Sequence, residues 1–171
     1  MQKKLESLAE GFYTHYVMKA LAKVTIPGRG LDSFEVTNAG KKDIFGHLLH
    51  MKSGDFDFPL WIGLNVKRVF VIYFVPLSES FGKAEAEKIF YFTFRGAEKV
   101  GFHMNFEEAE VEGEKVLSIW MTVETDDELL LNPQQKIFWA QDIAMMTESF
   151  LRTACRHNID LSLRKAVPAP L

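Results

Sequence analysis

Hydrophobic and polar residues follow a clear order between residues 83 and 123. An apolar stripe at helical spacing comes first, made by Ala86, Ile89, Phe90, Thr93, Phe94 and Ala97. Two runs with apolar residues at every second position follow: Phe102, Met104 and Phe106, then Leu117, Ile119, Met121 and Val123. A polar turn at residues 112–115 separates them. The pattern predicts a helix over 83–99 and a two-stranded hairpin over 101–123.

Residues 89–94 fit two structures. Their Ile, Phe, Tyr and Thr side chains all favour β-strands by propensity. Strong helix formers directly precede them at residues 84–88, and the helical stripe runs through them without interruption. Together these two features favour the helix.

The start of the chain predicts a long amphipathic helix over residues 3–24. Its apolar side chains recur at steps of three and four: Leu5, Leu8, Phe12, Tyr16, Ala20 and Val24. The lysines Lys3, Lys4, Lys19 and Lys23 decorate the other side, which we expect to face solvent rather than a phosphate or a membrane. Residues 27–30, Pro-Gly-Arg-Gly, predict a turn that ends this helix.

The next segments predict strands around one short helix. Residues 31–37 read as a short strand, and residues 40–51 as a helix with apolar positions at helical spacing. Residues 60–66 alternate as a strand does, and residues 69–75 are apolar at almost every position. Such a continuous apolar run is typical of a central strand that is covered on both faces.

The predicted helix over 40–51 carries the weak candidates for a metal site. His47 and His50 would lie on neighbouring positions of one helix face, and Asp55 or Asp57 would offer a third ligand. A zincin motif would instead have two histidines four residues apart with a glutamate after the first. We therefore favour ordinary surface histidines and expect no bound metal or other cofactor.

The C-terminal part predicts a long helix over 133–157. Asn132 fits the N-cap, and Pro133 fits the first helical position. One apolar stripe comprises Ile137, Ala140, Ala144, Thr147, Leu151 and Ala154; a second comprises Trp139, Ile143, Met146 and Phe150. An apolar arc this wide is expected to be buried by the sheet on one side and by a second subunit on another. Trp139 and Phe150 are thus candidate contacts with a partner.

The hairpin carries an unusual concentration of acid. Nine acidic residues and one lysine lie between residues 107 and 128. Two explanations fit these acidic residues. They either protect a sheet edge from aggregation or form a docking surface for a basic partner. Trp120 is expected on the strand face opposite the core, as an interaction anchor or covered by a neighbouring element. The candidate partner-binding residues here are Trp120, Glu107, Glu110 and Glu112.

Composition sets the remaining expectations. At 171 residues with a net charge of −3, the chain predicts one α+β domain over 1–165 and gives no sign of nucleic-acid binding. Its fold is expected to be an antiparallel sheet with helices on one face, led and closed by amphipathic helices. A single cysteine and a polar start suit a cytoplasmic protein without membrane insertion. Residues 166–171 are expected to form a flexible tail.

The predicted order of elements resembles the type III secretion chaperone-like fold, which includes the secretion chaperones and YbjN-type domains. The resemblance rests on the middle helix at 83–99, the hairpin at 101–123 and the last helix at 133–157. It implies a small, acidic, non-enzymatic protein that dimerises and holds an extended segment of a partner. No hydrolase elbow, Cys-x-x-Cys pair, zincin motif or P-loop is present in the sequence.

The expected function is therefore a chaperone- or adaptor-like protein-binding module that forms a homodimer. Two alternatives stay open. The fifteen phenylalanines are also compatible with a sensor domain that binds a small apolar ligand. A metal-dependent enzyme would have to use His47 and His50.

Overall fold

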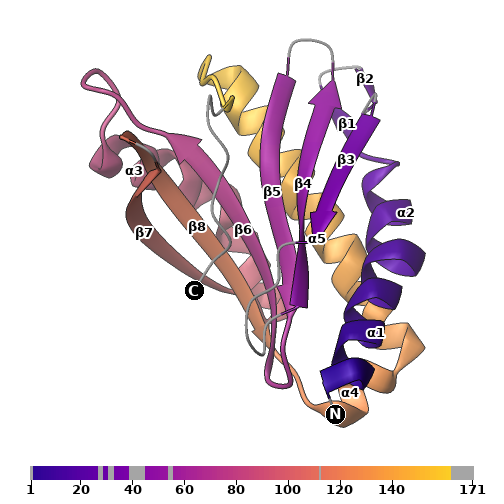
Figure 1. Cartoon of the computed structure of the whole chain (residues 1–171). Coiled ribbons are helices and arrows are strands. Elements are labelled where there is room, and N and C mark those ends of the chain that lie inside the picture. The colour runs from indigo at the N-terminus through magenta and orange to yellow at the C-terminus, as the bar shows by residue number, and fades with distance from the viewer. Residues whose placement is uncertain are drawn as a thin grey trace.

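The computed structural model describes residues 2–26, 29–30, 33–38, 45–53, 56–111 and 113–162. It is an α+β fold in which a twisted, fully antiparallel sheet carries its helices on one face (Figure 1). The sheet has six strands in the order β3-β4-β5-β6-β8-β7. These strands are β3 (Ser33–Asn38), β4 (Phe45–Ser53), β5 (Phe56–Leu64), β6 (Arg68–Pro76), β7 (His103–Val111) and β8 (Glu114–Glu124). The predicted fold class is confirmed.

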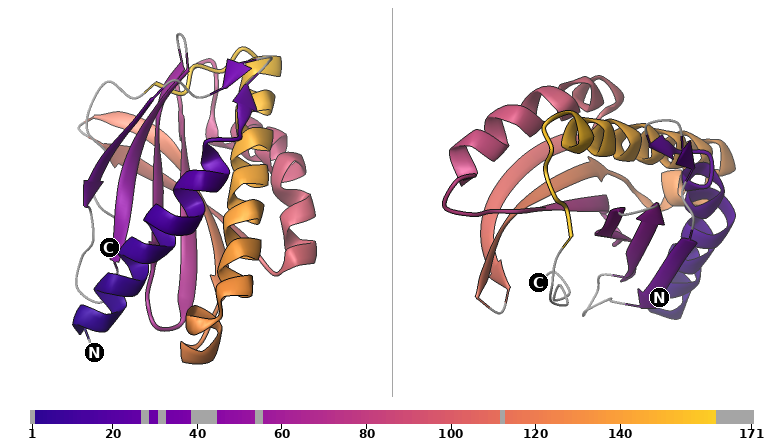
Figure 2. Two further views of the ribbon diagram at one scale, coloured as in Figure 1. Left: turned by 90° about the vertical axis from the view of Figure 1, so that its right-hand side faces the viewer. Right: turned by 90° about the horizontal axis from the view of Figure 1, so that it is seen from above.

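The helices form one layer, which Figure 2 shows on a single side of the sheet. The first helix runs without a break through α1 (Gln2–Phe12), a π-helical turn η1 (Tyr13–Val17) and α2 (Met18–Leu21). A separate small hairpin, β1 (Thr25–Ile26) with β2 (Arg29–Gly30), follows it. The other helices are α3 (Lys83–Phe94), the 3₁₀ segment η2 (Arg95–Val100), the short α4 (Asp127–Leu131) and the long α5 (Pro133–Arg156).

An aromatic cluster fills the space between the sheet and the helices. Phe150 of α5 lies at its centre, fully buried, with its ring centroid 4.7 Å from that of Tyr73 and 5.1 Å from that of Phe90. Phe94 and Phe58 surround the same ring at 6.0 and 6.5 Å. Burying side chains of this size contributes much of the stability of a domain this small.

Local polar contacts fix where the elements begin. The Asn132 side chain accepts hydrogen bonds from the backbone N–H groups of Gln134 and Gln135, so the predicted cap of the last helix is present. Asn65 does the same at the β5–β6 turn, where its side chain accepts from the N–H groups of Lys67 and Arg68. The hairpin turn contains Gly113 at a φ of 87°, a conformation that favours glycine.

Most predicted elements are present with small shifts of their ends. Residues 89–94 are helical within α3, and the hairpin and the last helix lie where the alternation and the Asn-Pro signal put them. Residues 163–171, which include the expected tail at 166–171, lie outside the described residues. Within the described ranges, no helix combines the length and the hydrophobicity that a membrane span requires.

The helix predicted over residues 40–51 is wrong. Residues 45–53 form strand β4, which pairs with β3 on one side and with β5 on the other. Leu48 and Leu49 are both buried, although neighbouring residues of a strand point to opposite faces of a sheet. Because this strand has apolar cover on both faces, its consecutive apolar residues imitate a helical pattern.

Candidate partner-binding groove

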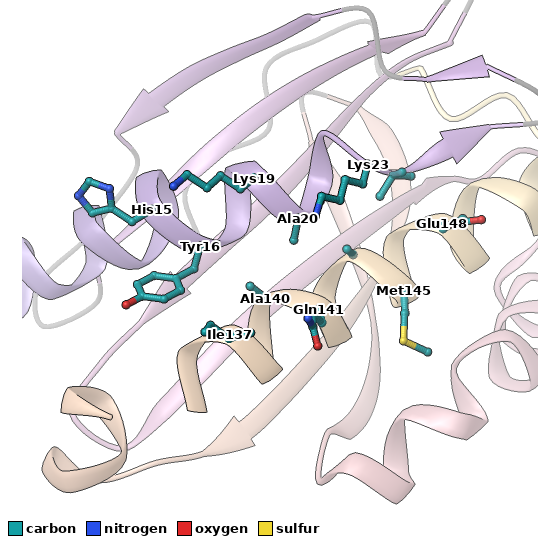
Figure 3. Close-up of a pocket in the computed structure, with 12 residues that line it drawn as sticks. His15, Tyr16, Lys19, Ala20, Lys23, Ile137, Ala140, Gln141, Met145 and Glu148 are labelled. Carbon is teal, nitrogen blue, oxygen red and sulfur yellow. The ribbon is translucent and has the colours of Figure 1, made fainter. Parts of the chain in front are cut away.

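An open groove of about 480 Å³ runs along the outside of the helix layer, between the first helix and α5 (Figure 3). We call it the α1–α5 groove. Twelve residues line it: His15, Tyr16, Lys19, Ala20, Lys23 and Val24 from the first helical segment and the residues after it, and Ile137, Ala140, Gln141, Ala144, Met145 and Glu148 from α5. Small and apolar side chains form its floor, and polar side chains stand along its rims.

The first helix and the turn after it place three basic side chains along one rim. His15 and Lys19 lie four residues apart on the first helix, Lys23 lies in the turn that follows it, and all three side chains are exposed (Figure 3). The π-helical turn at Tyr13–Val17 fits an extra residue into the hydrogen-bond ladder, a feature often found at functional sites. Tyr16, in the same turn, points toward α5.

The opposite rim and the floor come from α5. Ala140 and Ala144 are small, so the two helices leave space between them, and Met145 is 67% exposed beside that space. Such an exposed, flexible thioether side chain suits a surface that adapts to different partners. Ile137 adds a further exposed apolar side chain at the Tyr16 end of the groove.

The electrostatics of the groove favour an anionic partner. Its single carboxylate, Glu148, is already paired with Arg152 at 2.6 Å. No carboxylate in the described part of the chain forms an ion pair with Lys19 or Lys23. Close by, the Lys136 ammonium lies 5.8 Å from the centroid of the Tyr16 ring, and partial burial lowers the pKa of Lys136.

His47 and His50 do not form a metal-binding pair. They belong to strand β4, where a separation of three places side chains on opposite faces of the sheet. His47 lies on the helix side, with its ring centroid 4.5 Å from that of Tyr13, whereas His50 pairs opposite Pro59. Burial lowers the pKa of His47, and the negative charge of Glu10 partly opposes this.

The two aspartate candidates lie at the edge of what the structure describes. Asp55 lies outside the described residues, and Asp57 is placed in β5 by its backbone. Within the described ranges, no group of three His, Cys, Asp or Glu side chains is arranged to hold a metal ion.

The other sequence candidates fall into two groups. Trp139 and Phe150 are 3% and 0% exposed in the core between the sheet and the helices, so they cannot contact a partner while the fold is intact. Trp120 lies on the sheet face turned away from the helices, and Glu107 shares that face on the edge strand β7, opposite Ser118. Glu110 alternates onto the helix side, and Glu112 lies outside the described residues.

Sequence reasoning missed the groove itself. Lys19 and Lys23 were expected on a solvated face, and His15 was not singled out. Their spacing of four residues is visible in the sequence, but it does not show that α5 lies beside them. No protein-family model, curated protein or solved structure matches this chain.

Proposed function

We propose that this chain is a non-enzymatic protein-binding module, chaperone- or adaptor-like, which holds a segment of a partner polypeptide in the α1–α5 groove. The combination of an open apolar floor with the basic rim of His15, Lys19 and Lys23 supports this function. Grooves between two helices are a common seat for amphipathic helices, whose apolar residues enter the groove while their polar residues contact its rims.

The chemistry of the rims selects one occupant, an acidic amphipathic helix. The rim presents three exposed basic side chains, His15 and Lys19 on the first helix and Lys23 in the turn after it. A partner helix with Glu or Asp at every fourth position would place carboxylates along this rim while its apolar face enters the groove. Electrostatic complementarity of this kind raises the association rate and disfavours basic partners, which carry the same charge as the rim.

The test uses two synthetic amphipathic helices of the same length. Both carry Leu on one face; one carries Glu and the other Lys at every fourth position of the adjoining row. Fluorescence anisotropy at low and moderate salt measures their affinities for the full chain. We expect the Glu peptide to bind more tightly than the Lys peptide, and its affinity to fall as salt rises.

Charge-reversed variants identify the binding surface. The double variant Lys19→Glu, Lys23→Glu is expected to lose at least about tenfold in affinity for the Glu peptide, which corresponds to about 1.4 kcal/mol. The matched control Lys67→Glu, Lys115→Glu changes the net charge equally at exposed lysines outside the groove, and it should bind like the parent. Equal losses in both variants would show non-specific attraction and reject the groove.

The acidic hairpin provides the competing surface. If the Lys peptide binds more tightly, and if Glu107→Lys abolishes that binding, the partner is a basic segment on β7 and β8 instead. Glu107 is exposed on the edge strand, so this substitution should leave the fold intact. Such a result would keep the protein-binding function but move its site.

A further inference from the structure

A second open pocket, of about 540 Å³, lies on the side of α5 that faces α3. The two helices are neighbours in the helix layer, and α3 lies on the side of α5 opposite the first helix (Figure 2). No residue lines both this pocket and the α1–α5 groove, so the two are separate surfaces. We call it the α3–α5 pocket. Its volume falls within the range of about 300–1,000 Å³ that is usual for small-molecule sites.

Two threonines of the pocket join the helices to each other. The hydroxyl oxygens of Thr93 on α3 and Thr153 on α5 are 2.8 Å apart. The Thr93 hydroxyl donates to the carbonyl oxygen of Ile89 at 3.3 Å, so Thr153 is the donor within the hydroxyl pair. Both hydroxyl hydrogens are thus used inside the protein. A polar ligand therefore has to find its hydrogen-bond donors on the charged side chains around the pocket.

The charged side chains of the pocket are mostly basic. Lys88 comes from α3, Arg156 and His157 come from the C-terminal end of α5, and Glu85 is the carboxylate that stands against them. All four are exposed, and within the described ranges neither Lys88 nor Arg156 forms an ion pair. With histidine counted as neutral, two positive charges face one negative charge, which leaves an excess of one. A ligand with a single negative charge balances this excess, and a carboxylate matches the planar guanidinium of Arg156 through two parallel hydrogen bonds.

The pocket also has an apolar wall, which comes from α3. Phe92 is 65% exposed there, and Ile89, three residues earlier on the same side of the helix, is partly buried. Among the described residues, the Phe92 ring makes one aromatic contact, with Tyr91 at 5.8 Å between the ring centroids. A ligand whose apolar part covers the Phe92 ring would remove this surface from water, which favours binding.

We propose that the α3–α5 pocket binds a small monocarboxylate with an apolar body, such as a medium-chain fatty acid. Its carboxylate pairs with Lys88 and Arg156, and its apolar body covers Phe92 and Ile89. An inorganic anion would leave the phenylalanine uncovered, and an apolar amine would be repelled by the basic side chains. The pocket is open, and the partial negative charge at the C-terminus of α5 opposes an anion, so we expect an affinity in the millimolar range.

The test titrates the full chain with octanoate, acetate and octylammonium. Octanoate has both features of the proposed ligand, acetate keeps only the carboxylate, and octylammonium keeps the apolar chain with the opposite charge. Calorimetry measures the affinities, and amide chemical shifts locate the bound ligand. We expect octanoate to bind at least about tenfold more tightly than the other two, with the largest shift changes at residues 88–93 and 153–157. If octylammonium binds as tightly as octanoate, or if the shift changes lie elsewhere, the proposal is wrong.

Charge-removing variants test the basic side chains. Lys88→Gln with Arg156→Gln should weaken octanoate binding at least about tenfold. The matched control, Lys67→Gln with Arg68→Gln, also removes one lysine and one arginine charge, at the β5–β6 turn and outside the pocket. It should bind octanoate like the parent. All four side chains are exposed, so both variants should keep the far-UV circular dichroism of the parent. Equal losses in the two variants would show general attraction of anions to the chain and would overturn the proposal.

A third comparison tests the apolar wall. Phe92→Ser should weaken octanoate binding severalfold and leave acetate binding unchanged, whereas Phe138→Ser, which removes an exposed phenylalanine outside the pocket, should bind octanoate like the parent. Octanoate binding that does not depend on Phe92 would contradict the proposed contact. Displacement of octanoate by the Glu peptide would also overturn the proposal, because the α3–α5 pocket would then belong to a surface that binds polypeptides.

Discussion

The indole of Trp61 occupies the space that a side chain would need at Gly46, on the neighbouring strand β4. A Cβ at Gly46 would lie 2.5 Å from the Trp61 ring, and Gly63 of β5 faces the same ring even more closely. Gly46 and Gly63 are paired in register, so together they form a bare strip of backbone on which the indole lies. The two glycines thus determine where the Trp61 indole lies on the sheet face turned away from the helices.

Gly46→Ala should therefore destabilise the protein. The added methyl group must displace the Trp61 ring or bend the strand, and overpacking of this kind costs about 1–3 kcal/mol. Urea denaturation measures the change in the free energy of unfolding. Gly96→Ala is the matched control, because a Cβ there meets nothing within 4 Å. If both variants are equally stable, the indole is free to move and does not restrict the side chain at position 46.

A buried hydrogen bond between the sheet and α5 leads to the second prediction. The Thr147 hydroxyl donates to the Ile143 carbonyl at 2.8 Å, so the Tyr73 hydroxyl, also 2.8 Å away, donates to Thr147. Thr147→Val leaves the buried Tyr73 donor without a partner, whereas Tyr73→Phe removes the donor itself. We expect Thr147→Val to cost about 1–3 kcal/mol and Tyr73→Phe less.

The double variant Tyr73→Phe, Thr147→Val should be less destabilised than the sum of the single variants, because no donor is then left unsatisfied. Thermal and chemical unfolding of all four chains measure this coupling. Thr147→Ser, which keeps the hydroxyl, serves as the control. Strict additivity would mean that the two hydroxyls do not depend on each other.

His47 should make the protein less stable in mild acid. Burial against Tyr13 lowers its pKa below the ordinary histidine value of 6.5, although Glu10 acts in the opposite direction. Below pH 6.5 the unfolded chain therefore binds a proton more readily than the folded chain, and the free energy of unfolding falls as the pH falls. Above that pH the group contributes no pH dependence.

His47→Phe keeps a ring beside Tyr13 and removes the titration. The free energy of unfolding of this variant, measured in urea from pH 7.5 down to 5, should decline less than that of the parent. These pH values bracket the histidine range. His103→Gln, on the edge strand and exposed, is the control and should follow the parent. A parallel decline in all three chains would assign the acid sensitivity to other groups.

The sequence predicted the middle helix and the hairpin, although residues 89–94 of that helix also have a high β propensity. The stripe from Ala86 to Ala97 is helical, and the alternation of the hairpin matches the observed β7–β8 pairing. It failed at Leu48 and Leu49, where apolar cover on both faces of β4 imitates a helix. The same error misplaced His47 and His50 relative to each other. Residues three apart lie on the same face of a helix but on opposite faces of a strand.

The candidate sites were harder to predict than the fold. The wide apolar arc of α5 is present, but the sequence pattern does not show which part of it faces the sheet. Trp139 and Phe150 are buried in the core, whereas Phe138 and Met145 are exposed. The α1–α5 groove depends on how two helices far apart in the sequence lie together. No local pattern in either helix carries that information.

The exposed side of α5 leads to the last prediction, which concerns the homodimer expected from the sequence. Phe138 is 50% exposed and Met145 is 67% exposed, and their separation of seven residues places them on one side of the helix. An isologous contact between two copies through this side would bury Phe138 and Met145 of each copy. We expect the parent chain to dimerise in sedimentation equilibrium and Phe138→Glu to be monomeric. Phe92→Glu is the matched control, because Phe92 is 65% exposed on α3 and should leave the dimer intact.

Met145 also lines the α1–α5 groove, so a second copy and a partner helix would compete for part of the same surface. Adding the Glu peptide should therefore shift the parent chain toward the monomer, and Phe138→Glu should bind that peptide at least as tightly as the parent does. If the parent chain sediments as a monomer at every concentration, the dimer prediction is wrong. A dimer that binds the peptide without dissociating would instead place the contact between copies away from Met145.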